Sequence, residues 1–369
     1  MPLPRIVGLI LLGLVLALEV CSCGQMPELT GDTGVFDNPV GLAVHWPYAY
    51  VTCANFDLSG DKRGKLNVVD LRLALTKREK SVIFGVKTDP YLGKIIMSPD
   101  GKRLYATDRR HNSVLYFDLS DPARPKPIDL DAGRGGVQGV TVSRQPFGLA
   151  LSPDGKSLWV ACMSAGNVTI IDLASNRIAQ TIPLTSGANE VAFDPSGAYA
   201  YVTSRWGQEV AIVDAHNGEI IATFNPGPTQ SVIGFDNRAL AFTPDGRYLF
   251  IAARKPSSLL MLDTDKLPLY PQRAVLRTLP TDAGPTGVAI TPDGGEVWVC
   301  CYDSNTIFVF NTQNGELIKA LQYGDGPYDI KLVEDADHPG HLYAVITNFT
   351  GFNLSLIDAT TKEVVWAIP

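Results

Sequence analysis

The chain has 369 residues, 45% of them hydrophobic and 19% charged, with a formal net charge of −7 at pH 7 and a pI near 5.3. The acidic balance argues against a general nucleic-acid-binding surface, so we expect no nucleic-acid partner. With 34 glycines, 26 prolines and no long 3.6-residue periodicity, the sequence also argues against a helical fold.

The first residues have the features of a secretory signal. Arg5 precedes an apolar run over residues 6–18, which is too short to span a bilayer but suits the core of a signal peptide. The following Val20-Cys21-Ser22-Cys23 looks like a bacterial lipobox. We therefore predict a signal over 1–22, a lipidated Cys23 with a tether over 23–37, and a folded domain over 38–369. The alternative is an ordinary signal peptide followed by incidental cysteines.

A lipid on Cys23 would place the protein in the bacterial cell envelope. Two or more acyl chains anchor a protein stably to a membrane. Residue two of the mature chain would be Gly24 rather than aspartate. By resemblance to enterobacterial sorting, this favours the outer membrane, with the domain facing the periplasm.

The remainder of the chain repeats one pattern seven times. Each copy contains a short apolar run that ends in an acid or amide, and these ends lie 42 to 54 residues apart. A near-constant period of this length indicates a propeller or a solenoid. The seven run ends are Asp70, Asp118, Asp172, Asp214, Asp263, Asn311 and Asp358.

Each copy predicts four strands. In the third copy, apolar runs over 147–151, 158–161, 168–171 and 177–182 are separated by turn residues. The first turn, Ser152-Pro153-Asp154-Gly155, combines a proline that fixes φ with an Asp-Gly pair that tolerates a tight reversal. Four strands every 48 or so residues are typical of a propeller blade, so we predict an all-β, seven-bladed β-propeller of four-stranded antiparallel blades.

These copies resemble the YVTN family of bacterial β-propellers. The family signature is a run like Tyr201-Val202-Thr203, placed after a Pro-Asp-Gly-type turn and before a Val-x-Val-Ile-Asp-type strand. The resemblance covers residues 38 to 369 and implies the fold. It implies little about function, because the signature residues build the blade and one fold hosts many activities.

Two features bear on ring closure and on the cysteines. The run from Val364 to Ile368 predicts that the last blade supplies its own outer strand, with residues near 34–36 as the alternative edge strand. Alignment of the copies puts Cys53, Cys162 and Cys301 in one slot, in blades that are not neighbours. We expect these cysteines to be small buried thiols, and a strained Cys300–Cys301 bridge is the alternative.

Function should lie where the copies differ, in the loops that open on one face of the ring. The loops between second and third strands carry basic and aromatic residues, and the loops into the first strands add further polar groups. Arginine holds carboxylate or phosphate with two parallel hydrogen bonds, so we predict a face for an anionic ligand or a protein partner. The alternative is a set of solvated loop charges. The predicted face comprises Arg109, Arg110, His111, Arg205, Trp206, Arg254, Lys255, Glu190, Arg238, Tyr328 and Asp329.

The sequence favours a binding protein over an enzyme. Five histidines are scattered along the chain, and the cysteines match no zinc or haem spacing, so we expect neither a metal nor a cofactor. The main interpretation is a membrane-tethered periplasmic binding or scaffold propeller without catalytic residues. One alternative is a lactonase-like hydrolase, for which Glu190 and Arg238 are the first candidates. The other is an accessory subunit of a periplasmic redox enzyme.

Overall fold

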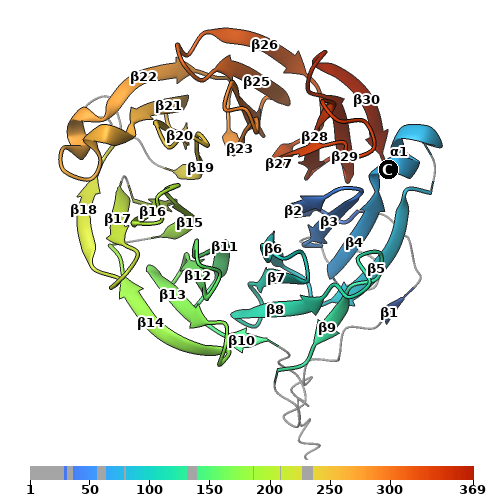
Figure 1. The fold of residues 1–369 in the computed structure, drawn as a ribbon, viewed down its shortest axis with the longest axis horizontal. Helices are drawn as coiled ribbons and strands as arrows, with labels where there is room; N and C mark the ends of the chain where they lie inside the picture. The colour runs from blue at the N-terminus through green and yellow to red at the C-terminus, as the bar shows by residue number, and fades with distance from the viewer. Residues whose placement is uncertain are drawn as a thin grey trace, which may run out of the picture.

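The structure is a computed structural model that describes residues 29–30, 36–55, 64–78, 80–130, 139–185, 187–207, 209–226 and 236–369. In this part of the chain, seven antiparallel sheets are arranged as a ring around one axis (Figure 1). The predicted seven-bladed propeller is therefore confirmed. The predicted signal, Cys23 and most of the tether lie outside the described residues. Within those residues, no helix is both long enough and apolar enough to cross a membrane.

The blades follow one another along the chain, each running from the axis outward. Blades one to three comprise β2 (Pro39–His45), β3 (Tyr48–Cys53), β4 (Gly64–Asp70), β5 (Val82–Thr88), β6 (Leu92–Met97), β7 (Arg103–Asp108), β8 (Ser113–Asp118), β9 (Lys126–Ile128), β10 (Val140–Thr141), β11 (Pro146–Leu151), β12 (Ser157–Cys162), β13 (Asn167–Asp172) and β14 (Arg177–Pro183). Blades four and five comprise β15 (Ala188–Phe193), β16 (Tyr199–Ser204), β17 (Val210–Asp214), β18 (Ile220–Phe224), β19 (Asn237–Phe242), β20 (Tyr248–Arg254), β21 (Ser257–Asp263) and β22 (Val275–Pro280). Blades six and seven comprise β23 (Pro285–Ile290), β24 (Glu296–Cys301), β25 (Thr306–Asn311), β26 (Leu317–Gln322), β27 (Pro327–Glu334), β28 (Leu342–Asn348), β29 (Asn353–Asp358) and β30 (Glu363–Ile368).

Two blades depart from the simple four-strand plan. In blade two, β9 and β10 both pair with β8, so two short strands share the outer position. In blade one, β1 (Leu29–Thr30) pairs with β5 as an additional edge strand. Short helices lie on the connections: α1 (Leu71–Thr76) after β4, and η1 (Thr264–Lys266) and η2 (Pro271–Arg273) after β21.

The ring closes by packing of complete blades. The last blade is β27 to β30, four consecutive strands that end at the C-terminus, as the run from Val364 predicted. The C-terminus lies beside α1 of the first blade (Figure 1). An apolar cluster joins the two blades, with Phe36, Leu42 and Leu71 of the first packed with Leu356 and Ile368 of the last.

The predicted first turn of the third copy forms as expected. In blade three, the Ser152 hydroxyl donates to Asp154 Oδ1 at 2.7 Å, and the Ser157 main-chain nitrogen donates back to the Ser152 hydroxyl at 2.9 Å. Gly155 has a φ of +68°, which glycine adopts without steric cost. The turn residues therefore fix the hairpin that joins the first and second strands.

The core lies between blades because the middle strands are covered on both faces. In the middle strand β12, five of six residues are buried. In the outer strand β14, six of seven residues are exposed. Trp159 and Trp298 fill equivalent places in this core. Cys53, Cys162, Cys300 and Cys301 are free and buried, and burial raises the pKa of the Cys162 thiol to about 11. The prediction of buried thiols is confirmed.

Candidate functional site

Every blade carries a β-bulge at the start of its innermost strand. In β15, for example, Ala188 pairs with Ser204 and Glu190 pairs with Thr203, so the register shifts between them. The same shift occurs in the other six blades. Bulges re-aim side chains and are frequent beside functional sites. Here they create two rings of seven residues around the axis.

The first bulge position is the one nearer the loops that open on the predicted face. It holds Val40, Gly93, Phe147, Asn189, Arg238, Thr286 and Tyr328. The second bulge position lies one residue deeper. It holds Gly41, Lys94, Gly148, Glu190, Ala239, Gly287 and Asp329.

The three charged residues of the second ring meet at the axis. Lys94 Nζ lies 2.9 Å from Asp329 Oδ1 and 4.0 Å from Glu190 Oε2. Burial disfavours the charge on Lys94, but the nearby Asp329 and Glu190 outweigh burial and raise the pKa of the lysine. Burial alone would raise the pKa of Asp329, yet Lys94 and further donors hold it below its usual value. For Glu190 burial prevails over Lys94, and its pKa is raised.

Glycines in the second ring make room for these charged residues. A Cβ on Gly41 would lie 2.8 Å from Lys94 Cα, and a Cβ on Gly148 would lie 2.7 Å from Glu190 Cα and 2.9 Å from its Oε1. A Cβ on Gly287 would lie 3.1 Å from Asp329 Cα. Each charged residue is therefore preceded, one blade earlier, by a glycine that lets its strand come close.

Above the rings, the loops between second and third strands bring arginines together. The Arg109 guanidinium lies over the Phe147 ring at 5.7 Å, and Arg254 lies over Tyr302 at 5.9 Å. Burial lowers the pKa of Arg109, and the charge of Arg205 lowers it further. Burial likewise lowers the pKa of Arg205, followed by the charge of Arg238. Four arginines thus influence one another on one face of an acidic protein.

The arginines differ in how their charge is compensated. Arg238 donates from Nη2 to Asp236 Oδ2 at 2.8 Å, and Arg254 forms an ion pair with Asp303. Within the described chain, Arg205 forms no ion pair with a carboxylate, and its recorded polar contact is Nη1 to Met163 Sδ at 4.0 Å. Arg205 is therefore a half-buried cation without a carboxylate ion-pair partner among the described residues.

Aromatic side chains surround the arginines. Tyr302, Tyr328 and Phe349 contact one another with ring centroids 5.7 to 6.0 Å apart. Phe147 and Met163 are almost completely buried in an adjoining apolar cluster. The face is thus a basic rim around an apolar floor. We call it the channel face, defined by Arg109, Phe147, Met163, Arg205, Arg238, Arg254, Tyr302, Tyr328 and Phe349.

A small cavity lies beneath the channel face, between the two rings. It measures about 10 Å³, which is room for a single water-sized group, and it lies among Lys94, Phe147, Asn189, Glu190, Arg238, Ala239, Thr286 and Tyr328. Residues of six blades, the second to the seventh, thus line it.

The structure brings together most of the predicted face. Arg109, Arg205, Arg238 and Arg254 lie close enough to influence one another, and Tyr328 belongs to the same channel face. Glu190 and Asp329 belong to the second ring beneath it. Trp206 follows Arg205 but is 53% exposed. Arg110 and Lys255 are exposed, and no contact among the described residues joins them to the arginines.

Sequence reasoning missed Lys94 and Asn189. Both occupy bulge positions, so alignment of the copies on their innermost strands would have revealed them. In that alignment Lys94 stands where most copies carry glycine or alanine. Tyr302 lies in the loop between the second and third strands of blade six, but its ring contacts with Tyr328 and Phe349 depend on the packing of blades six and seven.

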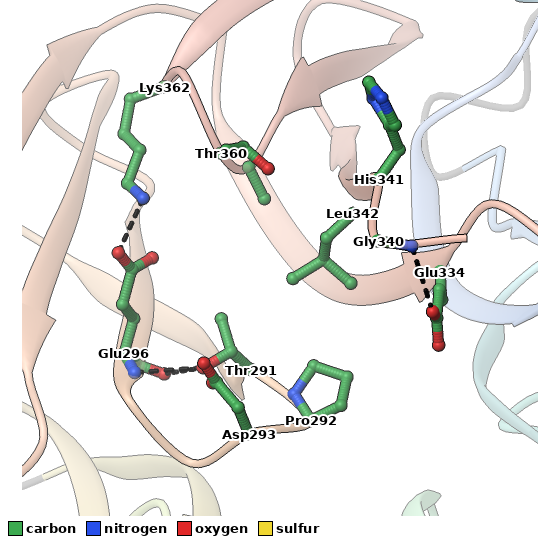
Figure 2. Close-up of a pocket in the computed structure, with 11 residues that line it drawn as sticks. Thr291, Pro292, Asp293, Glu296, Glu334, Gly340, His341, Leu342, Thr360 and Lys362 are labelled. Carbon is green, nitrogen blue, oxygen red and sulfur yellow. Dashed lines mark hydrogen bonds and ion pairs between the residues drawn. The ribbon is translucent and has the colours of Figure 1, made fainter. Parts of the chain in front are cut away.

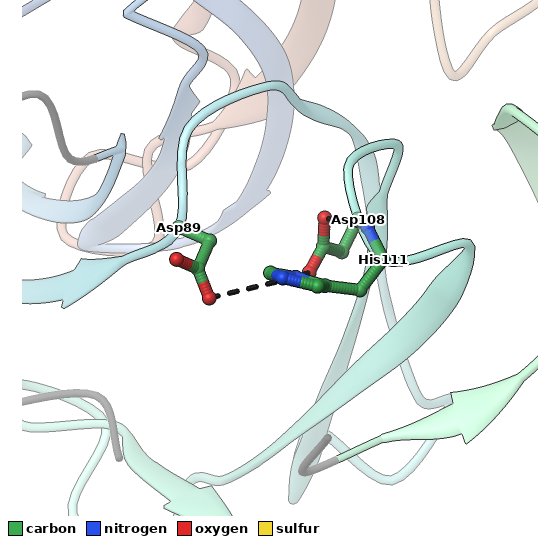
Figure 3. Close-up of side chains that lie close together, drawn as sticks. All are labelled: Asp89, Asp108 and His111. Atoms are coloured by element: carbon green, nitrogen blue, oxygen red, sulfur yellow. Dashed lines mark hydrogen bonds and ion pairs between the residues drawn. The ribbon is translucent and has the colours of Figure 1, made fainter. Parts of the chain in front are cut away.

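His111 lies in the predicted loop after β7, close in the chain to Arg109, and makes contacts of its own. Figure 3 shows it between two carboxylates at the junction of blades one and two: its Nδ1 lies 2.9 Å from Asp108 Oδ2 and 3.5 Å from Asp89 Oδ2. The hydrogen bond to Asp108 raises the pKa of His111, although burial opposes it. Asp335 and His338 form the same Asp-x-x-His contact at 3.0 Å. Because the same contact occurs in two turns, we interpret it as an interaction that stabilises the turn. Asp89, Asp108 and His111 together also offer the donor atoms that a metal ion could bind.

A groove of about 360 Å³ lies between blades six and seven, where the first turns of both blades meet. Figure 2 shows Lys362 and Glu296 on one side, with Leu342 in the middle and Glu334 at the far side. Lys362 Nζ lies 2.6 Å from Glu296 Oε1. This pair is satisfied within the protein and belongs to the end of the blades away from the channel face.

Comparison with known proteins gives matches to other propellers. Hydrazine synthase subunit beta of Kuenenia stuttgartiensis is 28% identical over 207 residues, which are 45% of this chain and 53% of that protein. The 6-phosphogluconolactonase of Enterobacter sp. is 26% identical over 174 residues, 43% of this chain and 49% of that protein. This chain thus spans about half the length of both relatives. The 6-phosphogluconolactonase of Blochmanniella pennsylvanica is 24% identical over 65% of this chain and 73% of that protein.

Solved structures share the fold at low sequence identity. A Kuenenia stuttgartiensis hydrazine synthase structure superposes with a TM-score of 0.68 at 16% identity, covering 88% of this chain and 96% of that chain. A Lactobacillus plantarum protein gives a TM-score of 0.66 at 13% identity, covering 82% of this chain and 89% of that chain. The family described as "Lactonase, 7-bladed beta-propeller" matches residues 64–178 and 133–331, and the chain belongs to this family.

Proposed function

We propose that the chain is a binding propeller whose channel face receives an anionic group of a ligand or protein partner. The observation that carries the proposal is Arg205, a half-buried guanidinium without a carboxylate partner among the described residues. A buried charge is costly unless it is paired. Arg109, Arg238 and Arg254 surround it, and an anion placed there would be attracted by all four.

Anion protection against unfolding tests this proposal. Phosphate, acetate and succinate are added to the protein, and the melting temperature is followed, because a ligand that binds the folded state stabilises it. We expect stabilisation in the wild type and its loss in Arg205→Gln. Arg177→Gln is the matched control, since Arg177 is an exposed arginine on β14, the outer strand of its blade. Equal stabilisation of all three proteins would contradict a site at Arg205.

The partner can be a protein. One relative bears the name of a subunit, hydrazine synthase subunit beta, which supports a role in an assembly. Trp206 adds a large exposed aromatic side chain beside Arg205, and tryptophan and arginine are frequent anchors of interfaces. The wild type and the triple variant Arg109/Arg205/Arg254→Ala are crosslinked in membranes and recovered with their bound proteins. A protein that is recovered with the wild type but not with the variant is a partner that depends on this face. The accessory-subunit alternative predicts that this partner is a redox protein.

Lactone hydrolysis is the second candidate. The family description and two relatives named 6-phosphogluconolactonase favour it, and Glu190 supplies a carboxyl of raised pKa beside the cavity. A carboxyl of raised pKa suits general acid or base catalysis. Hydrolysis of 6-phosphogluconolactone by the wild type, lost in Glu190→Gln, would establish this activity. Lack of turnover together with anion binding would favour the binding protein.

We also propose that Cys23 anchors the propeller to the periplasmic side of the outer membrane. The support is the Val20-Cys21-Ser22-Cys23 sequence after an apolar run of signal-peptide length. Metabolic labelling with a fatty acid should mark the wild type but not Cys23→Ser. After cell fractionation, we expect the wild type in the membrane fraction and the variant in the soluble fraction. The same distribution for both proteins would contradict the anchor.

A further inference from the structure

We infer that the ligand of the channel face carries a hydroxyl or amino group next to its anionic group, and that Asn189 and Glu190 receive this group in the cavity below. The inference rests on the proposed function and specifies the class of its ligand. It predicts a small substituted acid rather than a bare anion.

Asn189 is the first reason. Asn189 is 1% exposed and lines the cavity, and its Oδ1 has no hydrogen-bond partner among the residues that the structure describes. Buried polar atoms of native proteins nearly always have a partner, and an unsatisfied one is destabilising. The Asn189 oxygen is an acceptor, so it calls for a donor in the cavity.

Glu190 is the second reason. Among the described residues, its carboxylate pairs with Lys94 Nζ at 4.0 Å, which is beyond hydrogen-bonding distance, because Lys94 lies 2.9 Å from Asp329 Oδ1 instead. The Glu190 side chain is 16% exposed. Two neighbouring side chains of one strand, Asn189 and Glu190, therefore present acceptors to the same small space.

Of the other polar residues around the cavity, Lys94 pairs with Asp329 at 2.9 Å, and Thr286 and Arg238 also bind elsewhere in the protein. The Thr286 hydroxyl is shared as a donor between two main-chain carbonyls, that of Pro327 at 3.2 Å and that of Cys300 at 3.3 Å. Arg238 is 4% exposed and binds Asp236. The acceptors of Asn189 and Glu190 thus decide what the cavity takes.

Size and surroundings complete the inference. About 10 Å³ admits a hydroxyl or an ammonium group but not a longer branch. Phe147 and Tyr328 line the same cavity and belong to the channel face, so a short carbon skeleton would lie against apolar walls. Arg238 lines the cavity and is one of the arginines of the channel face, so a small molecule that occupies the cavity also lies beside a guanidinium of this face.

Three acids that differ at one carbon test the inference. Propionate, L-lactate and L-alanine share a three-carbon carboxylate skeleton and carry hydrogen, hydroxyl or ammonium at the second carbon. Propyl phosphate against 2-hydroxypropyl phosphate repeats the comparison with a phosphate, again with one added hydroxyl. Binding is measured by titration calorimetry on the wild-type protein. We expect the hydroxyl or amino compound to bind about tenfold more tightly than its plain counterpart, since about 1.4 kcal/mol is tenfold in affinity.

Two variants locate the effect. Asn189→Leu and Glu190→Leu should bring the ratio of affinities close to one while propionate or propyl phosphate still binds, because both remove an acceptor. A third variant, Arg205→Gln, should abolish binding of all five compounds. Equal binding of plain and substituted compounds by the wild type would overturn the inference but leave the proposed function standing. No binding of any compound by the wild type would overturn both.

Discussion

The Asp329 carboxylate accepts a hydrogen bond from the main-chain nitrogen of Leu42 at 3.1 Å, so a side chain of the last blade is bound by the backbone of the first. Its other oxygen lies 2.9 Å from Lys94 Nζ of the second blade. A second aspartate of the last blade, Asp337, accepts from Trp46 Nε1 at 3.0 Å and binds Arg72. The ring is thus closed by two aspartates together with the apolar cluster, while each blade keeps its own strands.

Replacing Asp329 should therefore destabilise the whole ring. Asp329→Asn leaves Lys94 as a buried charge without its nearest partner, and breaking a buried pair typically costs about 3 to 5 kcal/mol. Urea unfolding at neutral pH measures the loss. Asp337→Asn is the control, because its ion pair with Arg72 is exposed and should contribute far less. Equal effects of the two substitutions would show that the buried position has no special role in closure.

The glycines of the second ring give a sharper steric prediction. Gly148→Ala would place a Cβ 2.7 Å from Glu190 Cα, so blades three and four would have to move apart. Overpacking of this kind costs about 1 to 3 kcal/mol. Ala239 occupies the same position in blade five, where a Cβ is already present, so Ala239→Gly is the matched control. We expect a clear drop in melting temperature for the first change and a small one for the second.

The number of blades was predictable because the pattern of four strands recurs in every copy and the proline–glycine turn recurs in copies two to six. Proline, aspartate and glycine specify the turn that Ser152 and Asp154 form, and long apolar runs specify strands covered on both faces. The loop arginines were assigned to one face from the same repeat. Their partners were not predictable, because an ion pair such as Lys94–Asp329 depends on which blades face each other across the axis.

The threonine of the repeat signature joins neighbouring blades. Thr203 Oγ1 donates to the Arg238 carbonyl at 2.8 Å, and Thr107 does the same to the Phe147 carbonyl at 2.9 Å. Thr203→Val keeps the shape but leaves the carbonyl without this donor, which should cost about 1 to 3 kcal/mol. Thr203→Ser retains the hydroxyl and should lose much less. Denaturant unfolding of the two variants compares them directly, and similar losses would assign the role to the methyl group.

Glu190 should make the stability of the protein depend on pH above its usual pKa of 4.5. Because burial raises the pKa of Glu190 in the folded state, the folded protein holds this proton more tightly than the unfolded chain. Its contribution to stability is therefore greatest below pH 4.5 and falls as pH rises through the folded-state pKa. Asp329 acts in the opposite sense at lower pH, since its pKa is below 3.8 and its contribution is lost on further acidification.

Glu190→Gln separates the two groups. The glutamine cannot ionise, so the variant escapes the cost of a buried carboxylate at neutral pH while Asp329 still titrates. We expect the variant to be more stable than the wild type at pH 7, and the difference to shrink steadily as the pH falls to 4.5. Unfolding free energies measured between pH 4.5 and 8 provide the test. A difference that stays constant over this range would mean that Glu190 titrates alike in the folded and unfolded chain, and burial would then not govern its charge.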